Sequence, residues 1–181
     1  MDAQITELVA LAQRGDADAF GRLYSFYYKE MYAYARYMVG NDDRAQDAVS
    51  DAVLSAFKQI GGLKKADAFK SWMFRILSAS CKRQYTQARG NAAVVSLDDP
   101  ETDYTVGVVD DAALSVELRM ALAGLANDER EIILLHVFGG YKSHEIASIL
   151  GLLPATVRSK QARAFKKLRI ALGGDAFGEE G

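Results

Sequence analysis

Residues 141–168 read YKSHEIASILGLLPATVRSKQARAFKKL, and this stretch decides the fold of the C-terminal part of the chain. It has the pattern of a helix-turn-helix, in which two helices cross around a tight turn. Ser143 can cap the first helix, and the small Ala147 lets the two helices cross closely. Gly151 suits the left-handed backbone of the turn, and Pro154 fits the first position of the second helix, where an N–H has no helical partner.

The second helix of this motif carries a strongly basic surface. Residues 154–172 include six Lys and Arg side chains and no Asp or Glu. Arg suits bidentate contact with guanine in the major groove, and Lys suits phosphates. A solvated basic helix without a partner would show the same charges, but the glycine turn and the small residue at the crossing favour DNA binding. The outward-facing positions are Thr156, Arg158, Ser159, Lys160 and Arg163.

The composition fits a helical protein with one or two domains. Half of the 181 residues are apolar and only two are proline, which allows a buried core and favours helices. The formal net charge of -2 excludes a uniformly basic protein that coats nucleic acid, while a local basic face remains open. The single Cys81 excludes an internal disulfide and fits a reducing compartment. With no signal-like start and no long apolar run, we expect a cytoplasmic protein without membrane insertion.

Residues 17 to about 89 have apolar side chains at helical spacing, and we expect three helices that close a small bundle. The first ends at Gly40-Asn41-Asp42, which also caps the second, and the second ends at Gly61-Gly62. Their apolar stripes are Phe20, Leu23, Tyr24, Tyr27, Met31, Tyr34, Ala35 and Met38, then Ala45, Ala48, Val49, Ala52, Val53, Ala56 and Phe57, then Phe69, Trp72, Met73, Ile76, Leu77 and Ser80.

An acidic stretch separates this bundle from the C-terminal helices. Residues 91–112 contain six Asp and Glu, one Pro and no Lys or Arg. We interpret them as a linker between domains at residues 1–90 and 113–173, with a long surface loop in one domain as the alternative. Beyond it, Leu114 begins another apolar stripe, and Asn127 can cap the helix that follows. The predicted fold is all-α: two small helical domains joined by an acidic linker, the C-terminal one containing the helix-turn-helix.

Residues 125–168 closely resemble the promoter-reading C-terminal domain of bacterial sigma factors. The matching features, in order, are Leu125, Arg130-Glu131, an aliphatic run, Gly140-Tyr141, Glu145-Ile146-Ala147, Leu150-Gly151 and Thr156-Val157-Arg158-Ser159. The N-terminal block is similar to the matching sigma domain in the Phe20-x-x-Leu23-Tyr24 helix start, in AQDAVSDAVLSAF at 45–57 and in FKSWMFRIL at 69–77. The resemblance covers nearly the whole chain and indicates the small extracytoplasmic-function (ECF) group.

The resemblance implies two DNA-binding surfaces. In this family the C-terminal domain reads the upstream, minus-thirty-five element, and the positions that match its readers are Arg158, Ser159 and Arg163. The wider upstream set adds Tyr141, Ser143, Thr156, Lys160 and Lys166. The N-terminal domain melts and captures the downstream, minus-ten element, and the matching basic face is Lys64, Lys65, Lys70, Arg75, Lys82, Arg83 and Arg89, opposed only by Asp67. Trp72 could stack on a base, although its spacing with Phe69 and Ile76 favours a core position.

The resemblance also implies protein partners. Residues 43–57 resemble the main docking helix for core RNA polymerase, where carboxylates suit a basic partner surface. The docking positions, which lie opposite the apolar stripe, are Gln46, Asp47, Ser50 and Asp51. Solvated acids without a partner are the alternative. The expected partners are core RNA polymerase, promoter DNA and an anti-sigma factor.

The chain departs from the family pattern at several positions. Leu153 stands where a capping Ser is usual, Ala155 where Gly is usual, Gln161 where an aliphatic residue is usual, Lys160 where Arg is usual, and Ala126 where Pro is common. Ser78-Ala79-Ser80 lacks a frequent Asn, and Ser50-Asp51 replaces a frequent Gln-Glu. None breaks the fold, and together they leave the promoter sequence and the efficiency of melting open.

The sequence holds no constellation for catalysis or metal binding. His136 and His144 are eight residues apart and Cys81 lies in the other block, so no metal-ligand spacing is present. No phosphate loop follows the paired glycines. We therefore expect no enzymatic activity and no cofactor. The predicted function is a sigma factor that directs promoter-specific initiation. The alternatives are an operator-binding helix-turn-helix regulator and an all-helical adaptor, neither of which needs both an acidic docking helix and a basic melting helix.

Overall fold

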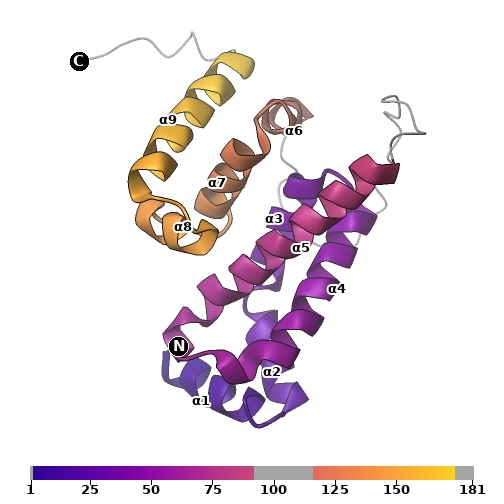
Figure 1. Cartoon of the computed structure of the whole chain (residues 1–181), viewed down its shortest axis with the longest axis vertical. Helices are drawn as coiled ribbons and strands as arrows, with labels where there is room; N and C mark the ends of the chain where they lie inside the picture. The colour runs from indigo at the N-terminus through magenta and orange to yellow at the C-terminus, as the bar shows by residue number, and fades with distance from the viewer. Residues whose placement is uncertain (1, 92–115, 174–181) are drawn as a thin grey trace. The chain divides into compact units, whose positions relative to one another are not determined.

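The computed structural model describes residues 2–91 and 116–173, which form nine α-helices, two short 3-10 helices and no strand (Figure 1). The all-α fold predicted from the sequence is confirmed for these residues. The chain divides into two compact units, Met1–Asp103 and Tyr104–Gly181. Within the described ranges, no helix is long and apolar enough to cross a membrane.

The first unit is a helical bundle built around two long helices. In chain order it contains α1 (Asp2–Ala12), α2 (Ala17–Ser25), α3 (Tyr28–Val39), α4 (Asp42–Gln59), η1 (Ile60–Gly62), η2 (Ala66–Ala68) and α5 (Phe69–Asn91). Helices α4 and α5 lie side by side, and α3 packs against both (Figure 1). Tyr34 on α3 and Phe74 on α5 are fully buried, as is Leu23 on α2, and the rings of Tyr34 and Phe74 meet edge to face at 5.7 Å.

The segment predicted as one helix from residue 17 to residue 40 is two helices. Helix α2 ends at Ser25, and Tyr27, with φ −118° and ψ −2°, precedes the start of α3. Leu23 before the break and Met31 after it are both completely buried. Because the apolar side chains point inward on both sides, the periodicity of the sequence passes across the break and does not reveal it.

Helix α1 was not predicted, and it completes the bundle by packing on α2. Leu8, Val9 and Ala12 are its buried face. Gln13 follows the helix, and its side-chain amide donates hydrogen bonds to the carbonyl oxygens of Ile60 at 3.1 Å and Leu63 at 2.8 Å. The N-terminal helix is thereby tied to the segment between α4 and α5.

The junction between α3 and α4 forms as the sequence predicted. Gly40 ends α3 with φ 72°, the left-handed region that glycine enters without strain. Asn41 then caps α4, since its side-chain oxygen accepts the N–H of Arg44 at 2.9 Å.

The second unit contains the predicted helix-turn-helix. Its helices are α6 (Val116–Ala123), α7 (Asn127–Val137), α8 (Ser143–Leu150) and α9 (Pro154–Ala171). Helix α9 packs against each of the other three, over a core that includes the fully buried Leu134, Ile146 and Val157. Gly151 makes the turn between α8 and α9 with φ 68°. Leu114 and the predicted linker lie outside the described residues, except for Asn91, which ends α5.

Candidate nucleic-acid interface

Helix α9 presents a polar, basic face to solvent. Arg158, Ser159, Arg163 and Lys166 are exposed and Thr156 is half-buried, whereas Val157, Ala164 and Leu168 are buried on the opposite side. Arg163 Nε donates to the carbonyl oxygen of Ser159 at 3.4 Å, so that side chain lies along the helix. The exposed side chains can reach a partner surface without any rearrangement of the core.

Two lysines of α9 are held by the start of α7. Lys160 donates from Nζ to Asp128 Oδ2, and Lys167 donates from Nζ to Glu129 Oε2 at 2.7 Å. The hydrogen bond from Lys160 is the main cause that holds the pKa of the Asp128 carboxyl below its usual range, with a smaller contribution from the backbone N–H of Glu129. Lys160, which we expected among the outward residues, is therefore turned toward α7.

Ser143 has a different role from the cap that the sequence predicted. It is the first residue of α8, and its hydroxyl donates to Gln161 Oε1 at 2.9 Å across the helix-turn-helix. The capping group is instead Glu145, which accepts the backbone N–H of Lys142 at 2.8 Å. Gln161, which stands where the family usually has an aliphatic residue, therefore joins α9 to α8. The side chains of Ser143 and Gln161 are both partly buried.

Tyr141 is only 7% exposed, which removes its ring from the surface expected to contact DNA. Its backbone is held as well: the N–H donates to the Leu135 carbonyl at 3.3 Å, and the carbonyl accepts from His136 Nδ1 at 2.9 Å. Because a carbonyl oxygen can only accept, Nδ1 is the ring nitrogen of His136 that carries the proton in this contact. Tyr141 is thus a packing residue between α7 and α8.

The start of α9 has no side-chain cap. Leu153 occupies the capping position and is 72% exposed, and Pro154 is the first helical residue. The first intrahelical bond is the one from the Val157 N–H to the Leu153 carbonyl at 3.1 Å. The departure from Ser at position 153 therefore leaves this helix start without the acceptor that such a side chain supplies.

Arg130 joins α6 to α7, a role that sequence reasoning missed. Its guanidinium donates to three carbonyl oxygens at the end of α6: Leu122 at 2.9 Å, Ala123 at 2.8 Å and Leu125 at 3.2 Å. Leu122 and Ala123 are the last residues of α6, whose carbonyls lack intrahelical partners, and Leu125 follows the helix. The Arg130-Glu131 pair in the sequence motif was the available signal, but its carbonyl partners cannot be found without the fold.

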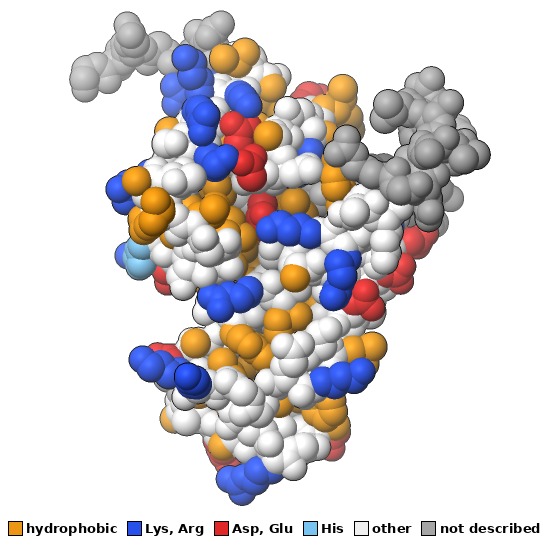
Figure 2. All heavy atoms as spheres, in the orientation of Figure 1, with side chains coloured by type: hydrophobic (Ala, Val, Ile, Leu, Met, Phe, Trp, Pro, Cys, Tyr) orange, Lys and Arg blue, Asp and Glu red, His pale blue; other side chains and the backbone are white. Residues whose placement is uncertain are grey.

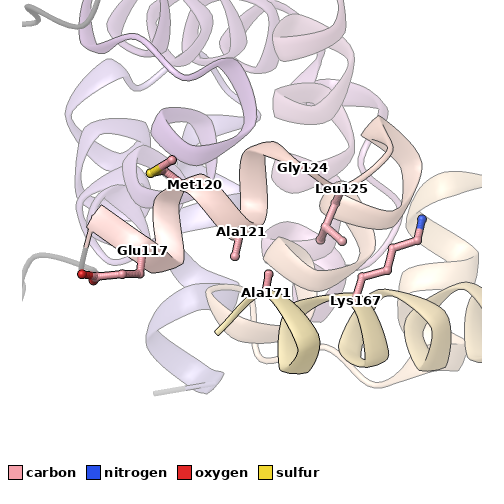
Figure 3. A pocket seen from close by; sticks show the side chains of 7 residues that line it. All are labelled: Glu117, Met120, Ala121, Gly124, Leu125, Lys167 and Ala171. Atoms are coloured by element: carbon pink, nitrogen blue, oxygen red, sulfur yellow. The ribbon is translucent and has the colours of Figure 1, made fainter. Parts of the chain in front are cut away.

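Among the described residues of the second unit, hollows lined mainly by apolar side chains lie beside α6 and α9. The first, of 480 Å³, lies between α6 and α9, where Ala121 and Ala171 face one another and Lys167 extends beside Leu125 (Figure 3). The second, of 530 Å³, is a groove along α6, α7 and α9 that includes the exposed Val137, Phe165 and Leu172. Within the described part of the chain, no three His, Cys, Asp or Glu side chains come together as a metal site would require.

The first unit carries most of its predicted basic residues at the surface. Lys64 and Lys65 are exposed between η1 and η2, and Arg75, Lys82 and Arg83 are exposed on α5. Figure 2 shows several Lys and Arg side chains over α5, separated by uncharged surface. Arg83 also donates to the buried Ser80 hydroxyl at 2.9 Å. The side chain of Arg89 lies outside the described residues.

Lys70 differs from the other members of this basic set. Its Nζ lies 2.8 Å from Glu30 Oε2 on α3 and 5.6 Å from the centre of the Tyr27 ring. It thus neutralises a carboxylate within the bundle. Trp72 is half-buried, with its ring tilted against Phe69 at 6.0 Å between centroids. This position agrees with the packing role that its spacing favoured.

Helix α4 exposes the four residues predicted to dock polymerase: Gln46, Asp47, Ser50 and Asp51. Its other face is buried, with Ala48, Ala52 and Ala56 fully enclosed. Leu54 was not predicted, yet it is 60% exposed and stands three residues after Asp51, on the same side of the helix. This surface therefore combines an apolar side chain with the carboxylates of Asp47 and Asp51, which precede it on the helix. The family-like segment 45–57 contained Leu54, but no partner surface could be assigned to it from spacing.

The fold is that of a two-unit helical protein with a helix-turn-helix. Comparison with known proteins identifies the family. Residues 23–90 match the family Sigma-70 region 2, and residues 115–168 match Sigma-70, region 4. The ECF RNA polymerase sigma factor SigM of Mycobacterium tuberculosis is 31% identical over 169 residues, which cover 92% of this chain and 84% of SigM. BldN of Streptomyces coelicolor, also an ECF sigma factor, is 28% identical over 96% of this chain and 68% of its own.

Solved structures agree with this assignment. The sigma factor RpoE of Bartonella quintana, determined in complex with the anti-sigma factor NepR, matches with a TM-score of 0.67 and 25% identity over 85% of this chain and 96% of that one. CnrH, determined in complex with the cytosolic domain of CnrY, shares the fold with a TM-score of 0.71 and 24% identity over 96% and 99% of the two chains.

The chain belongs to the ECF family of RNA polymerase sigma factors, which bind core RNA polymerase and direct promoter-specific transcription initiation. The function predicted from the sequence is confirmed, in preference to the operator-binding regulator and the adaptor.

Proposed function

We propose that this sigma factor holds a promoter at two points, with residues 113–173 on the upstream element and residues 1–90 on the downstream element. The observation that carries the proposal is the exposed basic face of α9 within a helix-turn-helix that matches Sigma-70, region 4. The intervening residues 91–112 connect the two domains in the sequence.

Base reading at the upstream element is assigned to three residues of α9. Arg158 and Arg163 contact guanine edges in the major groove, and Ser159 between them donates or accepts one further hydrogen bond. Thr156 and Lys166 contact phosphates on either side. The exposure of Arg158, Ser159, Arg163 and Lys166 supports this arrangement. The burial of Tyr141 and the hydrogen bond from Ser143 to Gln161 argue against direct contacts from those two.

Capture of the downstream element is assigned to the exposed cations of the first unit. Lys64 and Lys65 lie in the segment before α5, and Arg75, Lys82 and Arg83 lie along α5 itself. Separate cations of this kind can each contact a phosphate of a single strand. Lys70 contributes less, since Glu30 already neutralises it.

Polymerase docking is assigned to the exposed side of α4. Asp47 and Asp51 supply charge toward a basic partner surface, Gln46 and Ser50 supply hydrogen bonds, and Leu54 supplies apolar contact at the C-terminal end of this set.

We also propose that an anti-sigma factor regulates this chain, as the complex of the Bartonella quintana relative suggests. The chain would act in the cytoplasm, where it meets the polymerase. It would catalyse no reaction itself, because its contributions are recruitment, groove reading and strand capture.

The upstream contact is tested with Arg163→Ala and a duplex selected by the wild-type protein from a random library. If Arg163 reads a base, binding of that duplex weakens by about 1–3 kcal/mol, and discrimination is lost at one position. The matched control is Arg169→Ala, which removes the same charge nearly two turns further along α9, beside Leu172 at the apolar groove. Equal weakening on every DNA sequence would show that Arg163 is only a phosphate contact. An equal loss in both variants would show that Arg163 contributes only its charge, and no loss in Arg163→Ala would remove it from the interface.

A further inference from the structure

Lys160 and Lys167 share one edge of α9. They are seven residues apart, which is two helical turns, and both stand next to the buried stripe of Val157, Ala164 and Leu168. Each reaches a carboxylate in the first turn of α7, Lys160 at Asp128 and Lys167 at Glu129. The two ion pairs therefore fasten α9 to α7 at two points along its length.

The side chains of Asp128 and Lys167 are about half exposed, and hydrogen bonds to the backbone hold both carboxylates in place. The side chain of Glu129 is only 7% exposed, and its Oε2 also accepts the backbone N–H of Ala126 at 3.3 Å. Asp128 accepts the N–H of Glu129 at 2.8 Å through its other oxygen, which fixes its orientation toward Lys160. The Lys160 side chain is only 25% exposed. Both acceptors are therefore preorganised by the backbone of α7.

We propose that Asp128 and Glu129 are positioning residues for promoter recognition: they keep Lys160 and Lys167 away from DNA phosphates and set the orientation of α9. This inference rests on the proposed upstream contact of α9. Asp128 takes the place that a phosphate oxygen would otherwise hold at Lys160. The contacts that remain for DNA come from the exposed side of the helix, where Arg163 and Lys166 stand.

The salt dependence of DNA binding distinguishes a lysine that contacts a phosphate from one that is paired within the protein. Each lysine that neutralises a phosphate contributes about 0.9 to the magnitude of the slope of log K against log salt. We expect Lys160→Met and Lys167→Met to leave this slope unchanged, because their charges are already paired within the protein. Lys166→Met is the matched control: in the described part of the chain it makes no ion pair, and its loss should lower the slope by about 0.9.

The opposite change frees a lysine. Asp128→Asn keeps the size of the side chain and removes its charge, so Lys160 becomes available to a phosphate. We expect the slope to steepen by about 0.9, which corresponds to roughly an eightfold gain in affinity at 0.1 M salt relative to 1 M. Because the added contact is independent of sequence, it should strengthen binding to specific and non-specific duplexes by a similar factor. An unchanged slope in Asp128→Asn would contradict the proposal, as would a slope lowered equally in Lys160→Met and Lys166→Met.

A measurement without DNA keeps this test separate from that of the proposed function. Carbon-detected NMR titration of the full chain should show that the pKa of the Asp128 carboxyl is depressed in the wild type and higher in Lys160→Met. The same pKa in both proteins would overturn the ion pair itself. If the ion pair is present but the wild-type protein selects no duplex, the upstream contact of α9 fails. If the wild-type protein selects a duplex and Lys160→Met lowers the slope of log K against log salt, only the positioning role of Asp128 and Glu129 fails.

Discussion

At the scale of single residues, adjacent glycines are needed for different reasons. A Cβ atom on Gly139 would lie 2.4 Å from Tyr141 Cδ2 and 2.6 Å from the Leu135 carbonyl oxygen, so this position has no room for a side chain. A Cβ atom added to Gly140 would lie in open space, but the φ of 73° there is a conformation that other residues adopt only with strain. One glycine allows Tyr141 to pack, and the other turns the chain from α7 into α8.

Alanine at each position should separate these two causes. We expect Gly139→Ala to destabilise the second unit by about 3 kcal/mol, since one of the close atoms is a backbone oxygen that cannot move aside. Gly140→Ala should cost about 1 kcal/mol from backbone strain alone. Hydrogen exchange of amides in α7 and α8 measures both, and a larger loss of protection in Gly140→Ala than in Gly139→Ala would contradict the steric argument.

For single residues of α8 and α9, the sequence predicted the direction of a side chain but not its partner. The outward face of α9 was predictable, because Val157, Ala164 and Leu168 fix the inward direction by their spacing. The ion pair of Lys160 was not predictable, because its partner Asp128 lies 32 residues earlier on another helix. Nor could the sequence show that Ser143 meets Gln161, 18 residues away. Local spacing predicts which way a side chain points and leaves its long-range partner open.

At the scale of helices, the ends explain two mistaken predictions. Asn127 and Ser143 were predicted as caps, but each is the first residue of its helix. The cap in both cases is a glutamate three residues beyond the capping position: Glu129 accepts from Ala126, and Glu145 accepts from Lys142. A carboxylate in the first turn also suits the positive end of the helix dipole. Ser and Asn are the side chains that most strongly predict a helix cap from sequence, but the caps observed here are the neighbouring glutamates.

Helix α4 allows a prediction about one whole surface. Asp47→Lys together with Asp51→Lys should weaken binding to core polymerase and leave the affinity of the protein for DNA alone unchanged, because the reversed charges repel a basic partner surface. Polymerase binding is measured by titration with labelled protein. The control reverses Glu7 on α1 and Asp18 on α2, two exposed carboxylates of the same unit. Unchanged polymerase affinity in the α4 variant, or an equal loss in the control, would remove α4 from the interface.

At the scale of the whole molecule, the sequence predicted the class of protein better than the details of its helices. The helix-turn-helix was predictable because Gly151, Pro154 and the buried stripe of α9 act locally. Helix α1 was missed because its buried face is short, and the break near Tyr27 was missed because α2 and α3 bury one continuous stripe. Polymerase docking at α4 and capture of the downstream element remain predictions for particular residues.

The most direct test of the central claim is run-off transcription with purified core polymerase on a library of genomic fragments, with and without the protein. The account predicts discrete promoter-dependent products only when the protein is present, and their loss when Arg158 and Arg163 are both replaced by alanine. Products of equal yield without the protein, or no product with it, would contradict the account.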